Sequence, residues 1–183
     1  MNKRLFVGIP LGEEVIKATQ HIRQENSSLT YIRWTSLAQL HLTTWFIGEV
    51  PEEMFPNLKS ILQLICRRQK PFSLEFSHLY LSPNPRDARM LWAKYKSSPD
   101  FEKLIEKHRD LLGYLGIYER QFKKVIPHIT LARFKQGSLS KKDFKFIENF
   151  PKYLWVKELV LWESTLDSSG AIYQQITKSI FLQ

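Results

Sequence analysis

Two short stretches of the chain repeat one pattern, and they constrain its fold more than any other feature. The first is His41-Leu42-Thr43-Thr44-Trp45-Phe46 and the second is Pro127-His128-Ile129-Thr130-Leu131-Ala132-Arg133. Each holds a His-x-Thr triplet within an apolar run that is typical of a β-strand. Residues i and i+2 of a strand point to the same face, so the histidine and the threonine of each triplet share a face. Two such strands brought together would direct two imidazoles and two hydroxyls into one space.

The rest of the chain alternates between strand and helix patterns, without a linker or a low-complexity segment. Apolar residues at helical spacing predict helices over 13–24, 51–68, 99–113 and 141–150. Period-two and short apolar runs predict strands over 5–9, 31–34, 40–47, 72–77, 90–95, 126–134, 153–164 and 172–180. Because the two marked stretches echo each other, we expect an α+β fold built from two pseudo-duplicated halves, each contributing one marked strand.

Two histidines held across a small anion could carry out acid–base catalysis. Imidazole titrates near pH ~6.5, so one ring can be neutral while the other is protonated. The neutral ring would accept a proton from water, and the protonated ring would give one to a leaving alkoxide, each contributing typically ~10²–10⁴-fold. Thr43 and Thr130 could donate hydrogen bonds to phosphoryl oxygens, and Arg133 could supply a permanently charged fork. This chemistry requires no metal and no other cofactor.

The pattern alone leaves a structural interpretation equally open. A histidine in an apolar strand is usually a core residue, and threonine is common in strands. Under strict alternation Arg133 falls on the face opposite His128, so its role requires a bulge, a strand end or its long side chain to bring it round. The other three histidines are predicted to be structural or surface residues: His21, His78 and His108.

The charge balance favours an anionic partner. Lys+Arg 27 against Asp+Glu 18 give a formal net charge of +9, which fits nucleic acid, although solubility alone gives the same balance. Cys66 is the only cysteine, so we expect no internal disulfide and a reducing compartment. The N-terminal apolar run is too short for a signal sequence or a membrane span, and we predict a cytoplasmic protein. Cations that could guide an RNA backbone stand at Arg67, Arg68, Lys70, Lys123-Lys124 and Lys141-Lys142.

These residues give the chain a resemblance to the 2H phosphoesterases. It is most similar to the LigT-type branch of RNA 2′,3′-cyclic phosphodiesterases, also called 2′-5′ RNA ligase-like proteins. The two His-x-Thr stretches carry the resemblance, and three others support it: Arg4-Leu5-Phe6-Val7-Gly8-Ile9, Leu91-Trp92-Ala93 and Glu158-Leu159-Val160-Leu161-Trp162-Glu163-Ser164. The family implies one domain over residues 1–183, with a bilobal α+β fold. In that fold two antiparallel sheets related by a pseudo-twofold flank a central cleft, with the helices outside.

By position, the resemblance implies that His41 and His128 are the catalytic pair, that Thr43 and Thr130 bind the phosphate, and that Arg133 assists there. The implied reaction is metal-independent hydrolysis of a 2′,3′-cyclic phosphate on RNA, such as a tRNA fragment, to a 2′-phosphomonoester, by a monomer without cofactors. Some relatives also join RNA ends reversibly through a 2′-5′ linkage. In our hypothesis His41 is the acid that protonates the departing O3′ and His128 is the base that activates water, although the roles could be exchanged.

Two positions depart from the family pattern. Thr44 stands where an apolar residue is usual, and we expect it to face the core, where it packs less well or bonds to a backbone carbonyl. Val7 stands where some relatives have an aromatic that stacks on the nucleobase. The alternative candidates for base stacking are Phe6, Trp34 and Trp45, of which Trp45 shares the nominal face of the first triplet.

Other functions stay open at the level of sequence. The same chemistry could act on small cyclic nucleotides, or RNA ligation could be the physiological direction. A non-catalytic RNA-binding module is a further alternative, but binding alone does not need two titrating imidazoles.

Overall fold

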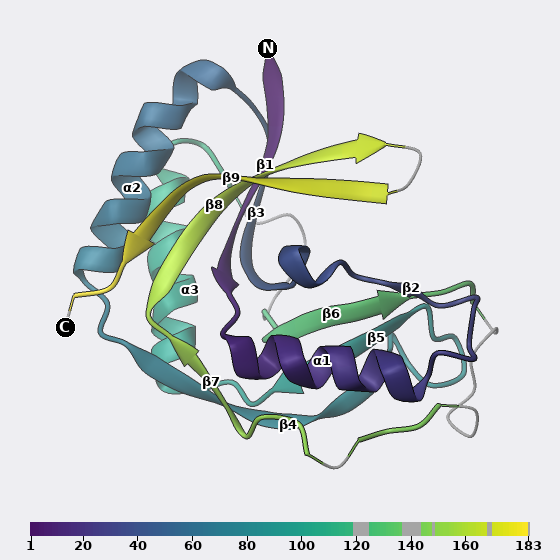
Figure 1. The fold of residues 1–183 in the computed structure, drawn as a ribbon. Coiled ribbons are helices and arrows are strands. Elements are labelled where there is room, and N and C mark those ends of the chain that lie inside the picture. The colour runs from purple at the N-terminus through teal and green to yellow at the C-terminus, as the bar shows by residue number, and fades with distance from the viewer. Residues whose placement is uncertain (119–124, 137–143, 148, 168–169, 183) are drawn as a thin grey trace.

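The computed structural model describes residues 1–118, 125–136, 144–147, 149–167 and 170–182. Within these ranges, three α-helices are interspersed among the strands along the chain (Figure 1). The helices are α1 (Glu13–Glu25), α2 (Phe55–Arg67) and α3 (Pro99–Gly113). The strands are β1 (Asn2–Pro10), β2 (Arg33–Trp34), β3 (His41–Pro51), β4 (Phe72–Ser82), β5 (Met90–Tyr95), β6 (His128–Arg133), β7 (Tyr153–Val156), β8 (Glu158–Asp167) and β9 (Gly170–Ile180).

The strands form one curled antiparallel sheet with the order β7-β4-β5-β6-β3-β1-β8-β9, and β2 pairs with β6 (Figure 1). The two marked strands, β3 and β6, lie side by side at its centre and are joined by a single backbone pair, Leu42 with Ile129. We call β3, β1, β8 and β9 the His41 half, and β6, β5, β4 and β7 the His128 half. The α+β class and the duplicated arrangement are confirmed. The two predicted sheets are the halves of one continuous sheet.

One face of the sheet carries the two triplets, and the other faces the core. In β5, for example, Leu91 and Ala93 are fully buried, whereas Trp92 and Lys94 point the other way and are half-buried. Buried apolar residues of the three helices join the core-facing strand residues in one hydrophobic cluster. Full burial of a Leu-sized side chain contributes roughly 1.5–3 kcal/mol, so this cluster is the main stabilisation of the fold. We call the other face, which bears His41, Thr43, His128 and Thr130, the histidine face.

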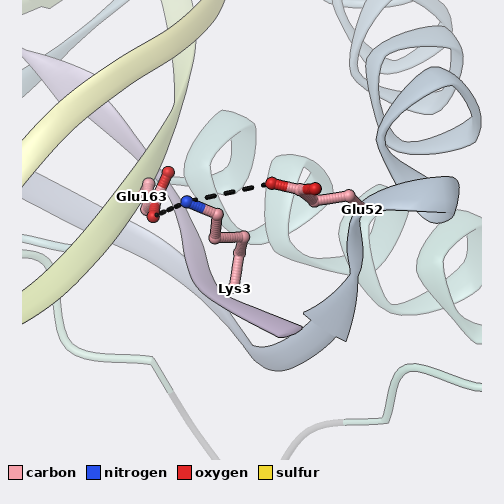
Figure 2. Close-up of polar contacts among 3 residues, drawn as sticks. All are labelled: Lys3, Glu52 and Glu163. Atoms are coloured by element: carbon pink, nitrogen blue, oxygen red, sulfur yellow. Dashed lines mark hydrogen bonds and ion pairs between the residues drawn. The ribbon is translucent and has the colours of Figure 1, made fainter. Parts of the chain in front are cut away.

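A polar link fixes the end of β1 that lies farthest from His41. The ammonium Nζ of Lys3 lies 2.8 Å from Oε1 of Glu163 in β8 and 3.8 Å from Oε1 of Glu52, just before α2 (Figure 2). The hydrogen bond from Lys3 to Glu163 is the main cause that raises the pKa of the lysine. The link ties β1 to β8 and to the start of α2.

Several predicted boundaries change. The first marked strand continues past Gly48, which adopts a positive φ of 87° that glycine tolerates, and it ends at Pro51. The run over 153–164 divides at Lys157 into β7 and β8, which pair in different halves. Of the helix predicted over 141–150, residues 144–147 and 149–150 are not helical, and the others lie outside the described residues. No helix in the described part of the chain is long and apolar enough to cross a membrane.

Candidate active site

The same irregularity occurs in both marked strands. From His41 to Phe46 and from His128 to Arg133, the residues run half-buried, buried, half-buried, buried, buried, exposed. Two buried residues in succession mark a β-bulge. The register of β3 against β1 skips Thr44, and the register of β6 against β5 skips Leu131. The duplication therefore extends to the backbone irregularity within each strand.

Each bulge inverts the alternation that follows it. Arg133 consequently lies on the same face as His128. Of the three features predicted to bring it there, the structure has the β-bulge. Phe46 takes the equivalent place in the His41 half and is 63% exposed. Trp45 is turned into the core, 3% exposed, with its ring 6.1 Å from that of His108. Its predicted place on the histidine face is therefore wrong.

Both histidines are held by the same hydrogen bond. Nδ1 of His41 lies 2.7 Å from the carbonyl oxygen of Gln39, and Nδ1 of His128 lies 2.8 Å from that of Ile126. A carbonyl oxygen can only accept, so Nδ1–H donates in each ring. A neutral ring then carries its one proton on Nδ1 and keeps a lone pair on Nε2. In each histidine Nε2 is thus the atom able to accept a proton, or to give one when the ring is charged.

The strand register brings the four predicted side chains together. The one backbone pair that joins β3 to β6 lies between the histidine and the threonine of each triplet. In an antiparallel pairing the residues that flank a pair oppose each other, so each histidine is set across from the threonine of the other triplet. A phosphoryl group could contact both imidazoles and both hydroxyls there.

The surroundings lower the pKa of both imidazoles. For His41, burial is the main cause, its carbonyl hydrogen bond opposes it, and the positive charges of His128 and Arg133 lower the pKa further. For His128, burial again comes first, again opposed by the carbonyl hydrogen bond, and Arg133 and Lys94 lower the pKa further. In the free protein both rings therefore favour the neutral form at neutral pH. A bound phosphate anion acts in the opposite sense and favours the imidazolium.

Aromatic rings surround the two histidines in different ways. The ring of Trp92 stacks on His128 with centroids 3.8 Å apart. The ring of His41 lies 4.7 Å from that of Phe6, 5.3 Å from Trp162 and 5.1 Å from Tyr173. In the sequence, the two Leu-Trp stretches, at 91–92 and 161–162, only supported a resemblance. Their repetition was the one signal that could have placed tryptophans beside both histidines.

Gly8 explains how a tryptophan reaches His41 from a more distant strand. Gly8 pairs with Thr43, as Trp92 pairs with Thr130 in the other half, so Gly8 and Trp92 hold equivalent places. A Cβ atom on Gly8 would lie 3.0 Å from Cζ3 of Trp162 and 2.7 Å from the Leu42 carbonyl oxygen. The missing side chain leaves the space that Trp162 of β8 fills. A substitution at Gly8 would therefore displace the tryptophan or the backbone of β3.

Arg133 is exposed at the end of β6, and its Nη1 lies 3.0 Å from Sδ of Met90. Its charge acts on the pKa of both histidines, which places the guanidinium near both. Among the described residues, no group of three His, Cys, Asp or Glu side chains could hold a metal ion.

Of the remaining predicted residues, all but His78 lie away from the histidine face. His21 and His78 are exposed, and His108 is fully buried with Nδ1 2.7 Å from the carbonyl oxygen of Leu104. As expected, Thr44 faces the core, where its hydroxyl lies 3.2 Å from the carbonyl oxygen of Val7. His78 is the exception in position, since it shares a face with residues beside His128.

Other polar candidates have no place in this site. Cys66 is buried, and burial raises the pKa of its thiol to about 12. Arg67, Arg68 and Lys70 are exposed at the end of α2, which belongs to the core side of the sheet. The lysine pairs at 123–124 and 141–142 lie outside the described residues.

Known proteins resemble this chain in both sequence and fold. Residues 9–92 match the family model described as LigT like Phosphoesterase. The curated RNA 2′,3′-cyclic phosphodiesterase of Methanocaldococcus jannaschii is 30% identical over 94% of this chain and 98% of its own length. A solved structure from Thermus thermophilus matches with a TM-score of 0.78 at 28% identity, over 96% of both chains. E. coli LigT complexed with 3′-AMP matches with a TM-score of 0.76 at 23% identity over 100% of both chains, a likeness that concerns the fold alone.

Proposed function

The chain belongs to the LigT-like phosphoesterases of the 2H superfamily, and from this premise we propose that it hydrolyses RNA 2′,3′-cyclic phosphate ends to 2′-phosphomonoesters without a metal. One observation carries the proposal: two His-x-Thr triplets meet at the centre of the sheet, with each imidazole held through Nδ1 and left with Nε2 for proton transfer. The name of the 30% identical relative supports the same reaction. The net charge of +9 supports RNA as the substrate class, tRNA fragments included.

The proposed step moves two protons across one phosphorus. Water attacks the phosphorus while Nε2 of His128 takes its proton. The bond from phosphorus to O3′ breaks, and O3′ takes the proton from Nε2 of His41, so that the phosphate stays on O2′. The reaction leaves His41 neutral and His128 protonated, and exchange with solvent restores both. Each proton transfer is expected to contribute ~10²–10⁴-fold.

The surroundings favour this assignment of acid and base over the reverse. Arg133 lowers the pKa of both histidines, whereas Lys94 acts on His128 and favours its neutral form, which a base requires. His41 lies among three aromatic rings, of Phe6, Trp162 and Tyr173, whereas one ring, that of Trp92, stacks on His128. Aromatic faces attract a cation. His41 is therefore the better site for the imidazolium that gives up its proton.

The other three residues would hold the phosphate during attack. Hydroxyls of Thr43 and Thr130 donate to its oxygens, and the guanidinium of Arg133 balances the charge that gathers on them. If a hydroxyl at another RNA end replaced water, the same proton transfers would join the two ends by a 2′-5′ bond. We extend the proposal to that reversible reaction and to a monomeric enzyme of the cytoplasm.

Substitution of each histidine tests the proposal. His41→Ala and His128→Ala should each lower kcat/KM for a cyclic-phosphate-ended RNA by ~10²–10⁴-fold with chelator present. The kcat/KM of the double variant should be only slightly below that of the less active single variant, because the effects of groups that act as a unit are not additive. His21→Ala, exposed on α1, is the matched control and should keep full activity. A single variant within a few-fold of the parent would contradict the mechanism.

A further inference from the structure

The histidine face continues outward from His128 as a row of side chains across the His128 half. His128 pairs in register with Lys94 of β5, and Lys94 pairs with His78 of β4. Directly opposed residues share a face of the sheet with their Cβ atoms roughly 4.5–5.5 Å apart. The neighbours of the Lys94 side chain across both strands are therefore imidazoles and not carboxylates.

A second row of aromatic rings runs beside the first. The ring of Trp92 stacks on His128, and the ring of Tyr80 lies 6.5 Å from Trp92. The ring of His78 lies 5.7 Å from Tyr80, and Nζ of Lys94 lies 4.7 Å from the Tyr80 centroid. We call His78, Tyr80, Trp92 and Lys94 the outer track. It places one lysine among three rings, and it begins at the proposed base.

The corresponding surface of the His41 half has a different character. Next to His41 lie the rings of Phe6, Trp162 and Tyr173. The nearest cation along that face of β1 is Arg4, which is opposite Glu49 in the register of β1 with β3. A strand of phosphates that leaves the histidine pair therefore meets Lys94 one strand away from His128. In the row of the His41 half that starts at Thr43, the cation is Lys178, which stands three strands from Thr43 and pairs with Glu158.

We propose that the outer track binds the RNA strand on the 5′ side of the cyclic phosphate. Lys94 contacts the phosphate that precedes the terminal nucleoside, and Tyr80 offers a ring face to a base. This inference rests on the proposed function, since it needs a substrate that extends from the histidine pair. A positively charged surface with interleaved aromatic rings is the usual means of binding single-stranded nucleic acid. Lys94 lies one strand spacing, ~4.8 Å, from His128, within reach of the next phosphate along the strand.

Substrate length gives the test. The substrates are a nucleoside 2′,3′-cyclic phosphate and oligonucleotides of two, three and five nucleotides with the same end. The parent should turn over the trinucleotide at least about tenfold better in kcat/KM than the mononucleotide. Lys94→Met should lower kcat/KM about tenfold more for the trinucleotide than for the mononucleotide, because only the longer substrate reaches the track, whereas a change in the pKa of His128 affects both substrates alike. The slope of log kcat/KM against log salt should become less steep by ~0.7.

Three further variants sharpen the result. Tyr80→Ala should lower kcat/KM for the trinucleotide about fivefold or more, because a base stacked on an aromatic ring contributes roughly that much. Lys94→Arg keeps the charge and should restore the length dependence. Lys59→Met removes one positive charge from the exposed side of α2. It should change kcat/KM for neither substrate.

Two results would overturn the track. One is an equal loss for mononucleotide and trinucleotide in Lys94→Met, which would place Lys94 at the reacting phosphate or assign its effect to the pKa of His128. The other is a parent whose kcat/KM is the same for the mononucleotide and the trinucleotide, which can be measured without any variant. A parent inactive on every cyclic phosphate would instead refute the proposed function itself, and the inference with it.

Discussion

The His41 half and the His128 half hold their histidines alike and surround them differently. In each, a bulge lies three residues after the histidine, and a carbonyl two residues before it accepts a hydrogen bond from Nδ1. Three aromatic rings surround His41, whereas one ring stacks on His128 and Lys94 brings positive charge to it; the charge of Arg133 acts on both histidines. The repeated backbone therefore sets where the two reactive nitrogens stand. In our proposal, the divergent neighbours divide the roles of acid and base between the two histidines.

The equivalent positions Arg133 and Phe46 give the strongest way to break this comparison. Arg133→Met should lower kcat/KM about 10–100-fold, because a charge-assisted hydrogen bond to a phosphate contributes roughly 1.5–3 kcal/mol. Arg133→Lys should recover part of the loss, since it keeps the charge but not the planar fork. Phe46→Met should lower kcat/KM for a cyclic mononucleotide by no more than a few-fold. Equal losses from Arg133→Met and Phe46→Met would remove the asymmetry from the account.

The threonine pair sharpens the shared part of the comparison. Thr43→Val and Thr130→Val each remove one hydroxyl while keeping a β-branched side chain, and each should lower kcat/KM about tenfold. Similar losses are expected because the register sets the two hydroxyls at equivalent places around the phosphate. Steady-state kinetics on one cyclic mononucleotide measures both. If only one threonine mattered, the phosphate would be held by one half alone.

The pH profile tests the protonation states of the two halves. The base must be neutral and the acid must be protonated, and the pKa of both histidines is lowered. Both limbs of kcat/KM against pH should therefore lie below the ordinary imidazole value of ~6.5, with an optimum on the acid side of neutrality. Arg133→Met should move both limbs to higher pH, since the arginine lowers both pKa values. A parent profile that stays at its maximum up to pH ~8 would contradict this protonation scheme.

Thr44, the bulge residue that corresponds to Leu131 in the other half, gives the smallest expected effect on activity. Thr44 is buried, with its hydroxyl 3.2 Å from the Val7 carbonyl and 3.3 Å from Nε2 of His108. Thr44→Val should lower the free energy of unfolding by about 1–3 kcal/mol, because it leaves buried polar atoms unpaired. Its kcat/KM should stay within about twofold of the parent. Denaturant unfolding and kinetics on the same preparation separate this residue from its neighbour Thr43.

The sequence predicted the parts that depend on local periodicity. The period-two pattern placed the histidine and threonine of each triplet on one face, and the strand pairing agrees with that. Helical spacing predicted α1 and α3 to within a residue or so of their ends. The charge balance pointed to an anionic partner before any fold was known.

The remainder depends on pairing with distant strands, which local periodicity cannot show. The bulges at Thr44 and Leu131 arise from the register with β1 and β5, so the sequence misplaced Trp45 and left Arg133 ambiguous. The contacts of His41 with Tyr173 and of His128 with Lys94 depend on strand order. Gly8 carried no sequence signal of its own, because its role is the space it leaves for a residue far along the chain.

The central claim is that two histidines, and no metal, open the cyclic phosphate toward O2′. The most direct test is an end-group assay on RNA with a 2′,3′-cyclic phosphate, incubated with the protein and a chelator. The terminal phosphomonoester is then identified by its position on the ribose. The account predicts a 2′-phosphate, formed at an undiminished rate in chelator. A 3′-phosphate product, or activity that disappears until a metal is added, would contradict it.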